Sequence, residues 1–150
     1  MKQCLADVNI LLALLVIHHA HHDFAARWFE GVNAGEVSLC RAVQLALIRL
    51  MGNRTIMGKY VLSASAAWGV IDEFLRDERV QFAAEPSQID AVFPLMLRYS
   101  IPTNKLVADA WLAAFAIASS FRLVTLDAGF RQFEGLDLQL LQAFPPAGGV

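Results

Sequence analysis

Hydrophobic residues recur along this chain with two different spacings, which predict an alternation of strands and helices. Short, predominantly apolar runs such as 37–40 are typical of strands that are buried on both faces of a sheet. Elsewhere the apolar residues recur at helical spacing, and Phe24, Trp28 and Val32 place one such stripe on a helix over 23–33. Because helices follow strands in turn, the pattern favours a parallel or mostly parallel sheet with helices on both faces.

Turn residues and changes of spacing set the boundaries of these elements. Residues 54–62 fit neither spacing and are predicted to form a loop, and Ser87 is predicted to cap a helix that runs to about Tyr99. One domain is expected over 1–143, followed by a flexible tail over 144–150. The predicted strands are 2–6, 37–40, 80–83, 123–126 and 136–141, and the predicted helices are 8–15, 23–33, 42–51, 64–76, 87–99 and 105–120.

Composition narrows the class of protein. Of 150 residues, 57% are hydrophobic and 17% are charged, which excludes disorder and suits one domain with a sizeable core. The apolar excess indicates that a partner covers part of the surface. Because the formal net charge is -2, any nucleic acid must be bound through a local patch or through metal ions rather than a strong overall field.

Neither membrane insertion nor export is expected. The uncharged stretch 110–121 falls short of the ~20 residues that span a bilayer. Asp7 interrupts the apolar run near the start, and no small-residue cleavage site follows that run. Cys4 and Cys40 lie far apart in the sequence and are expected to be buried free thiols, as in a cytoplasmic protein.

Three aspartates stand out because each lies within or at the end of an apolar run. Asp7 lies in QCLADVNILLAL, Asp109 in KLVADAWLAAFAIA and Asp127 in RLVTLDAGF. A carboxylate with apolar neighbours on both sides is costly to keep unless it is paired or takes part in chemistry. If the fold brings these acids together, their summed charge calls for a divalent cation, and carboxylate and water ligands suit Mg²⁺ or Mn²⁺.

Ideal geometry predicts that the acids do meet. Asp7 and Asp127 each follow a predicted strand directly, so a parallel sheet places both at its carboxyl edge, where the functional crevice of such sheets lies. From Asp109 the helix climbs ~16 Å to its end at 1.5 Å per residue. The returning strand covers ~16 Å to Asp127 at 3.3 Å per residue, so Asp109 reaches the same level.

Each acid also has a purely structural interpretation. Asp7 and Asp127 could each cap the turn that follows, and Asp109 could pair with Lys105 one helical turn earlier. Taken alone, a cap is the more common role of an Asp after a strand. The predicted helix around Asp109 is apolar on nearly all sides, however, and capping does not explain an acid inside it.

Gln44 is the fourth candidate of this site. It lies in the first turn of the helix after the strand 37–40, on the same carboxyl side of the predicted sheet. Its amide can offer an oxygen to a metal or to the water around it, but it cannot act as a base. Arg41 lies near the same edge and could contact an RNA phosphate, although a solvated arginine is the simpler interpretation.

The sequence resembles the PIN-domain ribonucleases, and most closely the VapC toxins of bacterial toxin–antitoxin pairs. The resemblance spans nearly the whole chain in the order of the family. The acids lie in the same strand and helix context as in that family, most specifically in the last two matching stretches. These stretches are LADVNILLALL, HHAHHDFAARWFE, SLCRAVQLALIRLMGN, LVADAWLAAFAIA and LVTLDAGFRQF.

The resemblance implies a fold and an activity. The fold is a PIN-like three-layer α/β/α sandwich with a mostly parallel central sheet. The activity is that of a metal-dependent endoribonuclease, with Mg²⁺ or Mn²⁺, which hydrolyses RNA phosphodiester bonds by metal-activated water. Such toxins are cytoplasmic, are usually homodimers, and are held inactive by a cognate antitoxin protein.

The resemblance also assigns roles to residues. Asp7, Asp109 and Asp127 match the acidic, metal-binding positions of the family, Thr125 matches its small hydroxyl residue, and Asn9 matches a polar position beside the first acid. This chain departs from the family pattern at one position, because the family usually has Glu where this chain has Gln44. That change removes one negative charge and implies weaker metal binding.

Two further features carry alternatives. The histidines His18, His19, His21 and His22 match no standard ligand spacing and are expected in a solvated turn, with an RNA contact or a metal site as the alternative. Trp68, Val70, Ile71 and Phe74 are expected in the core, with a groove for the antitoxin as the alternative.

Two other functions compete with the ribonuclease. The first is a catalytically inert PIN-like module that binds RNA or protein, which Gln44 would favour. The second is a phosphotransfer domain, in which Asp7 or Asp127 would accept phosphate. Such domains need a lysine near the acids, and none of Lys2, Lys59 and Lys105 follows a late strand, so this function ranks lowest.

Overall fold

A parallel five-stranded sheet forms the centre of the molecule. The computed structural model describes residues 2–98 and 104–142. The strands are β1 (Cys4–Ala6), β2 (Val37–Leu39), β3 (Val80–Phe82), β4 (Arg122–Thr125) and β5 (Leu138–Leu140), in the order β3-β2-β1-β4-β5, and every neighbouring pair is parallel. The predicted parallel sheet is therefore confirmed, with β1 at its centre.

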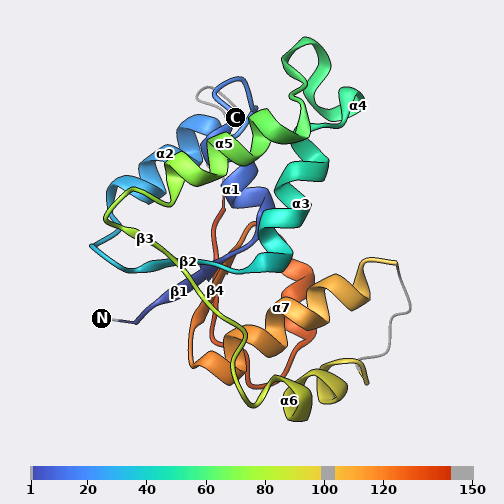
Figure 1. Ribbon diagram of the computed structural model, residues 1–150. Helices are drawn as coiled ribbons and strands as arrows, with labels where there is room; N and C mark the ends of the chain where they lie inside the picture. Colours follow the sequence, from blue (N-terminus) through green and yellow to red (C-terminus); the bar gives the residue numbers. More distant parts are fainter. Residues whose placement is uncertain (1, 99–103, 143–150) are drawn as a thin grey trace, which may run out of the picture.

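Helices cover both faces of this sheet, as expected for an α/β/α sandwich (Figure 1). One layer contains α1 (Val8–Leu15), α2 (His22–Glu30), α3 (Arg41–Met51) and α5 (Ala64–Phe74). The other layer contains α6 (Ile89–Met96) and α7 (Leu106–Ser119), which pack against each other. Two short 3-10 helices, η1 (Gly58–Tyr60) and η2 (Ala128–Gln132), complete the described part together with the short helix α4 (Arg54–Met57).

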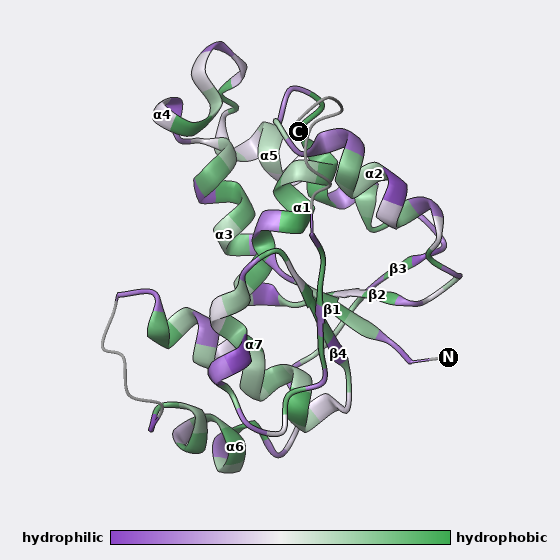
Figure 2. Cartoon of the chain, turned by 180° about the vertical axis from the view of Figure 1, so that it is seen from behind, coloured by the Kyte–Doolittle hydropathy of each residue, from purple (hydrophilic) through white to green (hydrophobic). Residues whose placement is uncertain are grey.

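The core lies between the sheet and both helical layers. Central strand residues such as Leu5, Leu39 and Leu123 have no exposed surface, and Phe115 of α7 is buried against them in the same cluster. Most of α7 is hydrophobic, with hydrophilic interruptions (Figure 2). Its alanines allow close packing on the sheet, so α7 is held firmly and its few polar side chains have fixed positions. None of the helices in the described ranges is long and apolar enough to pass through a lipid bilayer.

Two local predictions are wrong. Residues 54–62 are not a loop, because α4 and η1 lie within them. Asn53 caps α4 by accepting hydrogen bonds from the N–H groups of Thr55 and Ile56, and the side chain of Met57 is buried in the core. Ser87 is not the cap of the next helix, which begins at Ile89. Elements this short follow from local hydrogen bonds rather than from periodicity. Tyr99 and the predicted tail 144–150 lie outside the described residues.

Candidate active site

Asp7 lies at the carboxyl end of β1 with a buried carboxylate. Its backbone N–H donates to the carbonyl oxygen of Val124 at 2.9 Å, which continues the sheet by one more bond. Oδ1 accepts a hydrogen bond from Val8 N–H at 2.7 Å, so Asp7 does cap α1. The residue is only 3% exposed, and burial raises its pKa although hydrogen bonds from Thr125 and Val8 oppose that rise. Asp7 is thus a cap and also a perturbed carboxylate.

Thr125 connects two of the predicted acids. It ends β4 and is fully buried, and its Oγ1 donates to Asp7 Oδ2 at 2.8 Å. The same hydroxyl oxygen accepts a hydrogen bond from Asp127 N–H at 3.0 Å. Asp127 in turn caps η2, with Oδ1 accepting from Gly129 N–H at 2.8 Å. The hydroxyl expected beside the site therefore fixes the side chain of Asp7 and the backbone of Asp127.

Asp109 lies in the first turn of α7 and is 9% exposed. Its pKa is raised to about 6, mainly by burial and further by the negative charges of Asp7 and Asp127, while Lys105 opposes the rise. A carboxyl group whose pKa lies this close to neutral pH is characteristic of functional sites. Structural clusters of charged groups also produce such pKa shifts. Ideal geometry predicted that Asp109 lies at the same level of the sheet as Asp7 and Asp127. The effect of their charges on its pKa agrees with that prediction.

Lys105 joins Asp109 to Asp127. Its Nζ lies 3.8 Å from Asp109 Oδ2, which is the ion pair expected one helical turn away, and it also contacts Asp127 Oδ2 directly. This contact is the main cause of the lowered pKa of Asp127. Burial alone would lower the pKa of Lys105, but its bond to Asp127 and the charges of the three acids together raise it.

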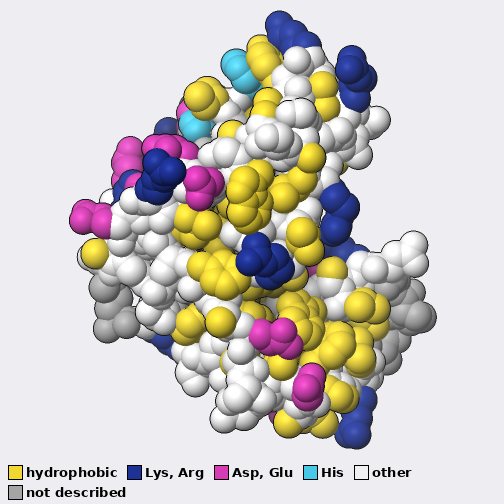
Figure 3. All heavy atoms as spheres, viewed as in Figure 1, with side chains coloured by type: hydrophobic (Ala, Val, Ile, Leu, Met, Phe, Trp, Pro, Cys, Tyr) yellow, Lys and Arg dark blue, Asp and Glu magenta, His cyan; other side chains and the backbone are white. Residues whose placement is uncertain are grey.

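A cleft of about 380 Å³ opens beside these groups, between α3 and α7. Asp7, Asp109 and Lys105 line it, together with Asn9 and Arg49. Figure 3 shows the molecule hollowed on the side where α3 faces α7, with Lys and Arg side chains at the edge of the hollow. Carboxylates therefore lie at the floor of a cleft whose lining also offers positive charge to an anion.

Gln44 is not among the side chains that line this cleft, although its neighbour Val43 is. The residue is buried, and its Oε1 accepts a hydrogen bond from Arg41 Nη1 at 2.7 Å. The guanidinium of Arg41 lies over the ring of Phe82, 5.0 Å from its centroid, and 6.0 Å from that of Trp68. The structure thus places Gln44 next to the site but directs its amide oxygen to Arg41 rather than to the acids.

The donor atoms of the site fit a hard divalent cation. Asp7, Asp109 and Asp127 offer carboxylate oxygens, which are the ligands that Mg²⁺ and Mn²⁺ prefer. Within residues 2–98 and 104–142, however, no three His, Cys, Asp or Glu side chains lie in an arrangement that could hold a metal ion as they stand. The ammonium of Lys105 lies at the carboxylates of Asp109 and Asp127 instead.

Sequence reasoning missed the position of Lys105. A phosphotransfer domain ranked lowest because none of the lysines follows a late strand. Lys105 nevertheless lies beside Asp109 and Asp127. The signal was its spacing of four residues from Asp109, which had been considered only as a local ion pair. Arg49, whose side chain lines the cleft from α3, had no signal beyond its charge.

The histidines have local roles in the structure. His18 stacks on Tyr60 with ring centroids 3.7 Å apart, and His22 Nδ1 lies 2.9 Å from the carbonyl oxygen of Ala13. His19 Nδ1 accepts a hydrogen bond from His21 N–H. These local contacts support the expected turn.

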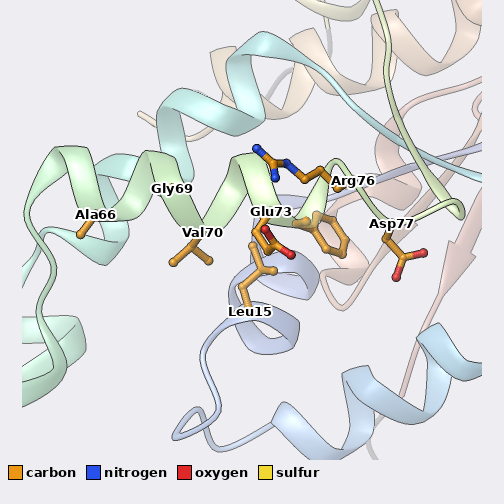
Figure 4. A pocket seen from close by; sticks show the side chains of 8 residues that line it. Leu15, Ala66, Gly69, Val70, Glu73, Arg76 and Asp77 are labelled. Carbon is orange, nitrogen blue, oxygen red and sulfur yellow. The ribbon is translucent and has the colours of Figure 1, made fainter.

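A second, wider groove lies elsewhere. It has a volume of about 740 Å³ between α1 and α5, and Figure 4 shows Leu15 of α1 pointing toward Glu73 of α5, with Val70 along the same side. Of the residues expected for a partner groove, Val70 and Phe74 line it. Ile71 is instead fully buried in the core, and Trp68, which is 42% exposed, lies beside Arg41.

Comparison with known sequences identifies similar proteins over nearly the whole chain. A model of the PIN domain matches residues 4–136. The chain is 41% identical over 142 residues to Ribonuclease VapC41 of Mycobacterium tuberculosis, covering 91% of this chain and 97% of that protein. It is 30% identical over 131 residues to Ribonuclease VapC29 of the same organism, covering 87% of this chain and 90% of that protein.

Solved structures share the fold at low sequence identity. The complex VapBC2 from Rickettsia felis, bound to a DNA fragment from its promoter, contains a chain with a TM-score of 0.63 and 16% identity, covering 91% of this chain and 97% of that one. Mycobacterium tuberculosis VapC20, described as a toxin that cleaves the sarcin–ricin loop, has a TM-score of 0.63 and 17% identity, with coverage of 90% and 98%. These likenesses support the three-layer architecture.

Proposed function

Because this chain belongs to the PIN-domain family, among its VapC-type ribonucleases, we propose that it is a metal-dependent endoribonuclease and the toxin of a toxin–antitoxin pair. The observation that carries the proposal is the convergence of Asp7, Asp109 and Asp127 at the carboxyl edge of the sheet. Two of these carboxylates line a cleft that also carries Arg49 and Lys105. The resemblance seen in the sequence is confirmed at the level of the family.

The three acids would hold Mg²⁺ or Mn²⁺, with Asp7 and Asp109 as the main ligands and Asp127 completing the set. A bound ion of this kind supplies Lewis acidity and lowers the pKa of water to produce a nucleophile. Thr125 keeps the carboxylate of Asp7 oriented, which is how residues behind a ligand preserve its geometry. Asn9 lines the same cleft and offers polar contacts near the first acid.

The positive side chains around the cleft would bind RNA through its phosphates. Arg49 and Lys105 line the cleft, and Arg41 lies at the start of α3 beside exposed aromatic rings. Contacts to phosphate fix the position of a nucleic acid without reading its sequence. This local charge supports RNA binding by a chain whose net charge is slightly negative.

The groove between α1 and α5 would receive the antitoxin. Its wall combines apolar Leu15, Val70 and Phe74 with charged Glu73 and Arg76, which suits an amphipathic segment with an apolar face and a polar margin. The similar solved structures include VapBC2 and FitAB, each bound to a DNA fragment. A homodimer acting in the cytoplasm, without contact with a membrane, completes the proposal.

Gln44 would support the site without binding the metal. Its amide oxygen is directed to Arg41, so the missing negative charge at this position does not alter the shell formed by the three aspartates. Gln44 and the ring of Phe82 hold the guanidinium of Arg41, which lines a second pocket beside the cleft. Activity therefore does not require Glu at this position.

RNA cleavage by the purified, antitoxin-free protein tests the proposal. Total RNA would be incubated with Mg²⁺ or Mn²⁺, with EDTA, and with the variants Asp109→Asn and Asp90→Asn. Asp90 is the matched control, because it is also an aspartate in the first turn of a helix but is exposed. Discrete products from wild type and Asp90→Asn, lost with EDTA and with Asp109→Asn, are expected. A folded wild-type protein that binds metal but leaves RNA intact would instead identify an inert binding module.

A further inference from the structure

Lys105 is the charged residue of this site for which hydrolysis by a metal-activated water gives no role. Its side chain is 54% exposed, whereas its partners Asp109 and Asp127 are 12% and 28% exposed. The ammonium therefore reaches the carboxylates from the solvent side, at the same opening through which an ion would enter. Exposed ion pairs of this kind are weak and exchange readily.

The oxygens that Lys105 contacts are those that a divalent ion would need. Asp127 Oδ1 accepts from Gly129 N–H, which leaves Oδ2 to Lys105. The nearer oxygen of Asp109 also faces the ammonium, at 3.8 Å. A metal ion binds carboxylate oxygens at about 2.1 Å, so an ion bound to both of these oxygens would lie close to the ammonium that now contacts them, and the two positive charges would repel each other.

Charge favours replacement of the lysine. The three ionised carboxylates carry three negative charges, of which one ammonium neutralises one and a divalent ion neutralises two. Lysine has a flexible four-carbon stem and keeps its charge in water, so it can leave the carboxylates without unfolding the helix.

We propose that Lys105 is a tethered counter-ion, which holds the acid cluster together without metal and must be displaced when the divalent ion binds. Lys105 is thus a positioning residue that sets the affinity and selectivity for metal, and it does not bind the metal itself. The inference rests on the proposed metal-dependent function. Removal of a tethered counter-ion strengthens metal binding. Removal of a structural ion pair would instead loosen the site and weaken metal binding.

Calorimetric titration of the RNA-free protein with Mn²⁺ tests whether removal of the Lys105 ammonium strengthens or weakens metal binding. Lys105→Met removes the ammonium and keeps a side chain of similar length, Lys105→Arg keeps the charge, and Arg49→Met removes another positive charge from the same cleft. No ion pair joins Arg49 to the acids within the described residues, so it reports the general effect of charge. We expect Lys105→Met to bind Mn²⁺ roughly two- to fivefold more tightly, the range of a weak ion pair, and Arg49→Met to change the affinity by less than about twofold.

Unchanged or weaker binding by Lys105→Met would overturn the inference, as would an equal gain in Arg49→Met. If no variant and no wild-type protein binds metal, the proposed metal-dependent function fails instead, so the two failures are distinguishable. Circular dichroism and thermal unfolding would confirm that each variant is folded before titration.

A second measurement on the wild-type protein keeps the inference testable if Lys105→Met does not fold. The chain has only three lysines, Lys2, Lys59 and Lys105, so side-chain NMR of lysine-labelled protein gives few and assignable signals. Saturating Mg²⁺ should move the Lys105 signal toward that of a free, mobile lysine while Lys59 stays unchanged. A Lys105 signal that remains immobile in the metal-bound protein would overturn the displacement.

Discussion

The hydroxyl of Thr125, the last residue of β4, donates a hydrogen bond over 2.8 Å to the buried carboxylate of Asp7, which directly follows the neighbouring parallel strand β1. They are separated by 118 positions in the sequence, yet the register of β1 on β4 sets them side by side. The same hydroxyl accepts from Asp127 N–H. One small side chain thereby fixes two acids of the site relative to the sheet.

Replacing this hydroxyl should damage both stability and activity. Thr125→Val keeps the shape of the side chain but leaves Asp7 Oδ2 and Asp127 N–H without their partner. We expect a loss of ~1–3 kcal/mol in the free energy of unfolding, measured by urea denaturation, because buried polar groups lose a hydrogen bond. Removal of a group that orients a metal ligand also lowers metal affinity or activity by ~10–100-fold.

Thr125→Ser is the matched control for that change. It retains the hydroxyl and loses one methyl group, so RNA cleavage should stay much closer to wild type than in Thr125→Val. Equal activity of the valine and serine variants would contradict the role assigned to the hydrogen bonds.

The raised pKa of Asp109 predicts how stability depends on pH in the metal-free protein. Because its pKa is about 6 in the folded state and lies near 4 in an unfolded chain, the folded state binds the proton more tightly. Stability contributed by this group is therefore greatest at acid pH and declines as the pH rises from about 4 to 6. Asp109→Asn should remove this decline and be more stable than wild type at pH 8.

Urea denaturation of both proteins between pH 4 and pH 8 in the presence of EDTA measures this difference. The advantage of Asp109→Asn should grow up to about pH 6 and then level off. Parallel pH profiles of the two proteins would show that Asp109 is not protonated in this range. At Mg²⁺ concentrations below saturation, metal binding and cleavage should weaken as the pH falls, because protons compete with the ion for the carboxylate of Asp109.

Gly129 should be sensitive to substitution although its backbone is ordinary. A Cβ built at this position lies 3.0 Å from Asp127 Oδ1, so in Gly129→Ala the carboxylate of Asp127 must shift by a few tenths of an ångström. We expect RNA cleavage to fall several-fold while the protein stays folded, since a flexible side chain rather than the backbone must move. Initial rates of cleavage at saturating Mg²⁺ would measure the effect.

Gly69→Ala provides the comparison, because its Cβ would meet nothing within 4 Å in α5. Replacing a helical glycine by alanine raises stability by ~1 kcal/mol, and cleavage should be unchanged. A similar loss of cleavage in both glycine variants would argue against crowding of Asp127.

Gln44→Glu should alter metal binding little. The introduced carboxylate would lie beside Arg41, to which the glutamine already bonds, rather than in the cleft. We expect the Mn²⁺ affinity to stay within about tenfold of wild type, or ~1.4 kcal/mol. A much larger gain in affinity would show that this side chain turns toward the acids when they bind metal.

The sequence predicted most of what depends on regular geometry. Asp7 directly follows β1 as predicted, and Asp127 follows β4 after one intervening residue. The rise of a helix compared with that of a strand predicted Asp109 at their level. The parallel sheet and the resemblance to the PIN family are confirmed for the same reason, since both depend on the order and spacing of elements. The roles of the acids as metal ligands stay predictions.

The rest depended on which way individual side chains point. Lys105 and Asp127 are separated by 22 positions, and nothing in the spacing indicates that they meet across the site. Gln44 was placed on the correct helix, but only the structure shows its amide turned to Arg41. Periodicity also placed Trp68 and Val70 on one helix without showing that only Val70 lines the groove.

Helix α1 gives the molecule a mechanical connection. It begins at Val8, directly after its cap Asp7, and ends at Leu15, which lines the groove between α1 and α5. The helix has eight residues, so ~12 Å of rigid backbone separate an acid in the cleft from the wall of the groove. A ligand that displaces Leu15 along the helix axis would therefore also displace Asp7. In this way, occupation of the groove would affect the position of a carboxylate in the cleft.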